Sequence, residues 1–140
     1  MTTATARKIF VNLAVKDLKK SVAYFEELGF SFNKQFTDDS ASMMNINDDA
    51  FAMLMTQERF QGFTPKQLVD PKTHAEVLIA VSAESREEVD SLVERALGAG
   101  GAPAGAAQDH GFMYARSFLD LDGHTWEVIW MDPSHVQSQS

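Results

Sequence analysis

The sequence contains no cysteine, few histidines and more acidic than basic residues, and each of these shortages excludes a class of function. Without cysteine, the chain has neither disulfides nor a thiolate metal site. Its 12 Lys and Arg against 20 Asp and Glu give a net charge of -8. This balance argues against a nucleic-acid partner, because phosphate backbones are bound by clustered cations. The 4 histidines form no pair at metal-ligand spacing.

The chain also lacks a long apolar run near its start. Arg7 and Lys8 are not followed by the extended hydrophobic stretch that a signal peptide or a membrane anchor requires. We therefore expect a cytoplasmic protein with no membrane partner. Its 140 residues, 44% of them apolar and 23% charged, are typical of a single soluble domain with its own core, spanning 1–140.

Residues 120–130 combine a turn with a strand. Asp122 and Gly123 form a tight-turn signal, because glycine accepts a positive φ at no steric cost. After the turn, side chains alternate between two faces, and three large apolar residues share one of them: Trp126, Val128 and Trp130. That face must be buried, so Glu127 is expected in the middle of the opposite face.

The hydrophobic pattern predicts the same order of elements twice: a strand, a helix and three further strands. In the first copy, Asp17 has the position of a helix N-cap and Gly29 that of a helix stop. In the second, Ser85 and Glu88 have capping-box spacing, and Gly98 and Gly100 stop the helix. The expected strands are 9–15, 30–36, 41–46 and 51–56, then 75–81, 103–108, 112–118 and the segment after Gly123.

This duplication predicts an α+β fold of two tandem βαβββ modules, over about 8–56 and about 75–131. The connection, 57–73, contains two prolines and two phenylalanines and is expected to hold a short helix. Such a long loop is either a functional lid or a linker packed by its own phenylalanines.

Two motifs carry a family resemblance over most of the chain. Val15-Lys16-Asp17-Leu18-Lys19-Lys20-Ser21 stands at the first strand–helix junction, and Asp120-Leu121-Asp122-Gly123-His124 is followed by Trp126-Glu127-Val128. The chain thereby resembles the vicinal oxygen chelate superfamily, which includes glyoxalase I, bleomycin-resistance proteins, fosfomycin-resistance enzymes and extradiol dioxygenases. The resemblance implies modules whose curved mixed sheets form a cup, a ligand or metal on the cup's inner face, and a homodimer.

In glyoxalase-like members, His or Glu residues hold the metal at four places, one on the first and one on the last strand of each module. The resemblance places these positions at Phe10, approximately Leu54, Glu76 and Glu127. Phenylalanine and leucine cannot ligate a metal, and two carboxylates alone make a poor site for a tightly held divalent ion. We therefore expect no metal or other cofactor. Glu76 and Glu127 are metal ligands only under the alternative function given below.

For Glu127 the sequence offers two interpretations. A four-residue connection, 120–123, would pair Leu119 with His124 and hence Arg116 with Glu127, directly across the hairpin. Glu127 is then one half of an ion pair with Arg116, a contact to a bound ligand, or both at once. In either case we expect the pair to lie inside the cup.

Five further candidates each have a plain structural alternative. Glu76 either contacts a ligand or is a solvated acid at a strand end, and Asn12 binds either a ligand or a neighbouring backbone group. His110 is an acid, base or ligand, or else a solvated turn residue. Tyr114 and Phe10, together with Phe118, would give the cup aromatic walls or simply fill a closed core.

Two functions remain open. The first is a glyoxalase/bleomycin-resistance-like protein that binds a small molecule in its cup without a tightly held metal. The alternative is a divalent-metal-dependent lyase or dioxygenase, of the lactoylglutathione lyase kind, with a remodelled metal site. The absence of histidine from the four implied ligand positions favours the first. The sequence does not identify the ligand.

Overall fold

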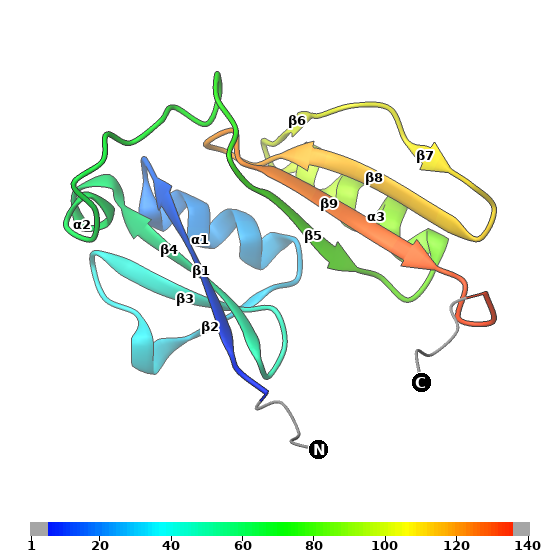
Figure 1. The fold of residues 1–140 in the computed structure, drawn as a ribbon, viewed down its shortest axis with the longest axis horizontal. Coiled ribbons are helices and arrows are strands. Elements are labelled where there is room, and N and C mark those ends of the chain that lie inside the picture. The colour runs from blue at the N-terminus through cyan, green and yellow to red at the C-terminus, as the bar shows by residue number, and fades with distance from the viewer. Residues whose placement is uncertain (1–5, 136–140) are drawn as a thin grey trace, which may run out of the picture. The chain divides into compact units, whose positions relative to one another are not determined.

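The computed structural model describes residues 6–135, and the chain divides into two compact units, the first ending at Leu68 and the second beginning at Val69. Each unit contains a helix that covers one face of a mixed sheet (Figure 1). The predicted fold class, α+β with tandem βαβββ modules, is confirmed. In the part of the chain that the structure describes, every helix is too short or too polar to traverse a bilayer.

The first unit follows the predicted order of elements. Asp17 caps its main helix as expected, with its carboxylate accepting a hydrogen bond from the Lys20 N–H at 3.1 Å. Gly29, at a φ of 104°, lies just past the helix end. The elements are β1 (Ile9–Val15), α1 (Leu18–Glu27), β2 (Ser31–Asn33), η1 (Lys34–Phe36), β3 (Ala41–Asn45), β4 (Ala50–Thr56) and α2 (Gln57–Gln61). The strand predicted over 30–36 is therefore shorter and continues as a 3-10 turn.

The first sheet has the strand order β1-β4-β3-β2, with β1 parallel to β4 and the other pairs antiparallel. One face packs against α1, which contacts β2, β3 and β4. Its core includes Leu13, Val15, Met44 and Leu54, all of them buried. Because side chains alternate along a strand, the residues between these point to the opposite face, which we call the open face of the first sheet.

The second unit repeats this topology. It contains β5 (Leu78–Ser82), α3 (Arg86–Gly98), β6 (Ala102–Pro103), β7 (Gln108–Asp109), β8 (Met113–Leu119) and β9 (Thr125–Met131). The order is β5-β9-β8-β6, with β7 also on β8, and β5 is parallel to β9 just as β1 is parallel to β4. The strand predicted over 103–108 is instead two short pieces, β6 and β7, separated by irregular backbone.

The capping signal of α3 is confirmed in part. The Ser85 hydroxyl accepts a hydrogen bond from the Glu88 N–H at 3.0 Å, as a capping box requires. The Glu88 carboxylate accepts from the Glu84 N–H at 2.8 Å, one residue before the cap. Both bonds occupy groups near the helix start that would otherwise face only water.

The connection between β8 and β9 is one residue longer than predicted. Leu119 pairs with Thr125, so the loop consists of the five residues 120–124. Asp120 explains the extra residue. Its buried carboxylate accepts backbone N–H groups across the turn, from Asp122 at 3.0 Å, Gly123 at 3.1 Å and His124 at 3.0 Å. The loop therefore closes around this side chain.

The longer loop shifts the hairpin register by one residue. Ser117, not Arg116, lies opposite Glu127, and Arg116 lies opposite Val128. Since a one-residue shift moves a side chain to the other face of a sheet, Arg116 and Glu127 point in opposite directions. The predicted ion pair between Arg116 and Glu127 is therefore wrong.

Candidate ligand site

The open face of the first sheet is hollowed into a cavity of about 600 Å³. This volume lies within the range of sites that hold drug-sized molecules. Side chains from all four strands of the sheet, from the residue before β1 and from η1 line it: Lys8, Phe10, Asn12, Asn33, Phe36, Met43, Phe51 and Met53. Five of the eight are apolar, although the face that they occupy is not the one that α1 covers. We call this cavity the hollow.

Two phenylalanines form an aromatic surface in the hollow. The parallel register of β1 and β4 places Phe10 beside Phe51, with their rings 5.1 Å apart between centroids and inclined by only 16°. The Phe10 side chain remains 49% exposed. Met43 is almost fully buried, and Met53 lies beside it in the antiparallel register of β3 and β4. The hollow thus has flexible thioethers at its base and aromatic rings nearer solvent.

Three polar side chains complete the lining. Asn12 makes no side-chain hydrogen bond to another of residues 6–135, so its amide is available to a bound molecule. The side-chain oxygen of Asn33, Oδ1, accepts a hydrogen bond from the Gln35 N–H at 2.9 Å, and the side-chain NH2 group of Asn33 takes no part in that bond. The Lys8 ammonium donates to the Asp48 carbonyl oxygen at 2.6 Å and lies 3.2 Å from an Asp49 carboxylate oxygen.

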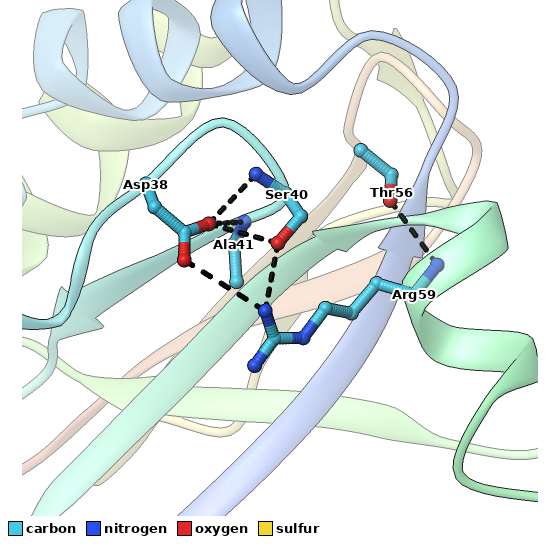
Figure 2. Close-up of polar contacts among 5 residues, drawn as sticks. All are labelled: Asp38, Ser40, Ala41, Thr56 and Arg59. Atoms are coloured by element: carbon cyan, nitrogen blue, oxygen red, sulfur yellow. Dashed lines mark hydrogen bonds and ion pairs between the residues drawn. The ribbon is translucent and has the colours of Figure 1, made fainter.

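A polar cluster fixes the chain between η1 and β3, the two elements that contribute Phe36 and Met43 (Figure 2). One carboxylate oxygen of Asp38 accepts from the Ser40 N–H at 2.7 Å and from the Ala41 N–H at 3.0 Å. The Ser40 N–H bond is the main cause of a lowered Asp38 pKa. Arg59 of α2 donates to the Ser40 hydroxyl at 2.8 Å and so ties α2 to this segment.

The structure places Arg116 and Tyr114 against α3, on the helix-covered face of the second sheet. Arg116 donates to Asp90 at 3.0 Å and to Glu94 at 2.6 Å, two acids one helical turn apart. The Tyr114 hydroxyl donates to Asp90 at 2.7 Å. The hydrogen bond to Glu94 is the main cause of a raised Arg116 pKa, and that from Tyr114 is the main cause of a lowered Asp90 pKa.

Tyr114 and Phe118 therefore do not form the predicted aromatic walls of an open site. Phe118 is buried on the same helix-covered face, with its ring stacked on that of Trp126 at 6.5 Å between centroids. The prediction that Tyr114, Arg116 and Phe118 share one face is confirmed, but the face is the opposite one. The physical reason is again the extra loop residue held by Asp120.

Glu127 does lie on the face of the second sheet opposite α3, as its position between Trp126 and Val128 predicts. Its neighbours across the ladders are Ser117 and Ala80, neither of which carries a charge. Glu127 is half-buried and forms no ion pair with another of the described residues. Contact between Glu127 and a ligand stays a prediction.

Glu76 and His110 both lie outside regular strands. The strand predicted over 75–81 begins only at Leu78, because its parallel partner β9 begins at Thr125 and offers no earlier pairing position. Glu76 is thus an exposed residue in a bend before β5. His110 is exposed in the turn after β7, with its ring 6.5 Å from that of Phe112.

The residues at the four implied metal positions do not fit a metal. Leu54 is 0% exposed on the helix-covered face, so it is not the residue equivalent to Glu127. Glu127 pairs with Ala80, and the matching pair in the first sheet is Met55 with Ala14. Phenylalanine at position 10 offers no donor atom, and methionine offers only a weak one. Among residues 6–135, no three His, Asp or Glu side chains gather closely enough to hold an ion.

Two of the eight lining residues, Phe10 and Asn12, are among the ligand-binding residues predicted from the sequence, and the other six are not. Phe51 and Met53 alternate along a predicted strand, and this pattern could have placed both on one face. Their proximity to Phe10 depends on the parallel pairing of β1 with β4, which joins residues about forty positions apart in the chain. For Lys8 and Asn33 the sequence contains no comparable signal.

Comparison with known proteins agrees with this architecture. The chain resembles a hypothetical protein from S. aureus, with 28% identity, a TM-score of 0.77, and coverage of 91% of this chain and 95% of that one. A glyoxalase-related enzyme from Fulvimarina pelagi is similar at 20% identity and a TM-score of 0.75, covering 90% and 88%. A fosfomycin resistance protein from Listeria monocytogenes matches at 18% identity and 0.64, covering 99% and 97%. No curated protein sequence matches the chain.

Tandem βαβββ modules with first and last strands paired in parallel define the class of protein to which this chain is assigned. The sequence profile of the Glyoxalase/Bleomycin resistance protein/Dioxygenase superfamily matches residues 9–128. The chain belongs to this superfamily, which confirms the family resemblance predicted from the sequence motifs.

Proposed function

We propose that this protein binds an apolar, partly aromatic small molecule in the hollow, without a tightly held metal. The observation that supports this proposal most directly is the apolar lining of the hollow. Phe10, Phe51 and Met53 stand on the sheet face that α1 does not cover, where alternation would ordinarily place polar side chains. Apolar walls with a few polar groups are the usual composition of a small-molecule site.

The rings of Phe10 and Phe51 and the side-chain amide of Asn12 suggest how a ligand is oriented. A flat ring system can continue the stack of Phe10 and Phe51 in an offset arrangement. Asn12 offers both a hydrogen-bond donor and an acceptor, so it can fix the direction of one polar group. Met43 and Met53 can adapt their side chains to the outline of the bound molecule.

The test is a titration with N-phenyl-1-naphthylamine, a neutral aromatic dye whose emission rises in apolar surroundings. We expect saturable binding by the wild-type chain. Phe10→Ala should weaken it about tenfold, because ~1.5 kcal/mol of ring contact is lost. Phe63→Ala is the matched control, since Phe63 is 72% exposed and lies outside the hollow.

The same titration separates the two candidate functions. Without a metal in the site, a chelator should leave the dissociation constant unchanged. Binding that disappears with the chelator and returns with a divalent ion would favour the metal-dependent lyase or dioxygenase instead. If the wild-type chain does not bind the dye, or if Phe10→Ala and Phe63→Ala behave alike, the hollow is not the binding site.

A further inference from the structure

Lys8 distinguishes the hollow from a purely apolar pocket. Of the described residues that line it, Lys8 alone carries a charge. Its ammonium group lies over the Phe51 ring, 5.7 Å from the ring centroid. A cation held beside an aromatic surface is suited to a ligand that has both a ring and a negative charge.

The hydrogen bonds of Lys8 leave donor capacity for a ligand. An ammonium group has three N–H donors. One is directed to the Asp48 carbonyl oxygen at 2.6 Å and one to the Asp49 carboxylate at 3.2 Å. Both acceptors belong to the turn between β3 and β4, so this turn positions the charge, and among residues 6–135 no other group accepts from the third donor.

The partner carboxylate of Lys8 is only loosely held. The side chains of Lys8 and Asp49 are 55% and 77% exposed, and ion pairs as exposed as this one contribute little to stability. A bound anion can therefore compete with Asp49 for the ammonium group, while the neutral carbonyl of Asp48 continues to hold Lys8 in position. With a net charge of -8, the protein otherwise repels anions, so a local cation is needed to hold one.

We propose that Lys8 makes the hollow selective for aromatic anions, molecules with a flat ring system and a single carboxylate- or sulfonate-like group. The ring lies on Phe10 and Phe51, and the anionic group reaches the ammonium of Lys8. This inference rests on the proposed function, since it concerns the same cavity. It adds a class of ligand and names the residue that selects it.

The experiment compares two probes that differ by one anionic group: N-phenyl-1-naphthylamine and 8-anilinonaphthalene-1-sulfonate. Lys8→Met should weaken binding of the sulfonate about fivefold and leave binding of the neutral dye within about twofold of wild type. Lys20→Met is the matched control, because Lys20 also lies near an Asp, at 4.0 Å, but does not line the hollow. It should change neither affinity.

A second variant is expected to change sulfonate affinity in the opposite direction, which separates an effect on binding from a loss of folding. Asp49→Asn removes the competing carboxylate, so it should strengthen sulfonate binding and leave the neutral dye unaffected. If Lys8→Met and Asp49→Asn change both probes equally, or change neither, then Lys8 does not select the anion and the inference is wrong. If the wild-type chain does not bind the neutral dye, the proposed function itself fails.

Discussion

Replacing Asp120 by alanine should lower the free energy of unfolding by about 3 kcal/mol or more, because it leaves buried donors without an acceptor. Besides the three N–H groups of its own loop, the Asp120 carboxylate accepts a hydrogen bond from the Trp126 indole at 3.0 Å. Trp126 is fully buried under α3. One side chain thus connects the loop to the core of the second unit.

Two further variants test whether the loss of stability comes from Asp120 itself. The measurement is the midpoint of urea unfolding for each variant. Burial raises the pKa of Asp120 above its ordinary value, so ionisation of this carboxyl is less favourable in the fold than in the unfolded chain. Asp120→Asn keeps one oxygen acceptor without that charge and should lose less stability than Asp120→Ala at neutral pH. Asp48→Ala removes an exposed turn carboxylate and serves as the control. Equal midpoints for Asp120→Ala and Asp48→Ala would show that Asp120 does not hold the loop.

The second large effect concerns Leu54 and Met53, adjacent residues on opposite faces of the first sheet. Leu54→Glu should lower the free energy of unfolding by about 4 kcal/mol or more, since it buries a carboxylate without a partner on the face that α1 covers. Met53→Glu should cost no more than about 1.5 kcal/mol, because its side chain borders the hollow, where water can reach it.

Thermal and urea unfolding of the two variants would measure this difference directly. The two substitutions introduce the same side chain one position apart, so differences in strand propensity are small and the facing of the strand dominates. A larger loss for Met53→Glu than for Leu54→Glu would reverse the assignment of faces and remove the hollow from the open face.

The fold was predictable because its signals are local. Asp17, Gly29 and Gly100 mark helix ends through their own capping or backbone conformation, and runs of alternating apolar residues mark strands. Repetition of the same order then identified two modules. Strand boundaries that were predicted wrongly, such as the start of β5, depend on where the partner strand begins. The partner lies far away in the sequence, so the local pattern does not contain this boundary.

In the second unit, the faces predicted for the β8 side chains were wrong because of a single residue. The sequence around Asp122 and Gly123 predicts a tight turn, but the length of that turn depends on Asp120 accepting N–H groups across it. This side chain looks like an ordinary turn residue in the sequence. A second signal was available: Asp90 and Glu94, four residues apart on a helix, present two acids that a cation such as Arg116 can join.

The candidate site was only partly predictable for a related reason. Phe10 and Asn12 are two residues apart on one strand, so the alternation of side chains along that strand is enough to place both on the same face. The remaining lining comes from strands whose pairing brings distant segments together, so Phe51 and Met43 join the site through sheet topology. Lys8 depends further on the turn at Asp48, which holds its ammonium group.

The most direct test of the hollow as the binding site is a nuclear magnetic resonance titration with methyl-labelled methionine. N-phenyl-1-naphthylamine carries aromatic rings whose local fields shift the resonances of methyl groups that they touch. We predict shifts for Met43 and Met53, which line the hollow, and none for Met44, which is fully buried on the helix-covered face. Unchanged Met43 and Met53 resonances at a dye concentration that saturates binding would contradict the account.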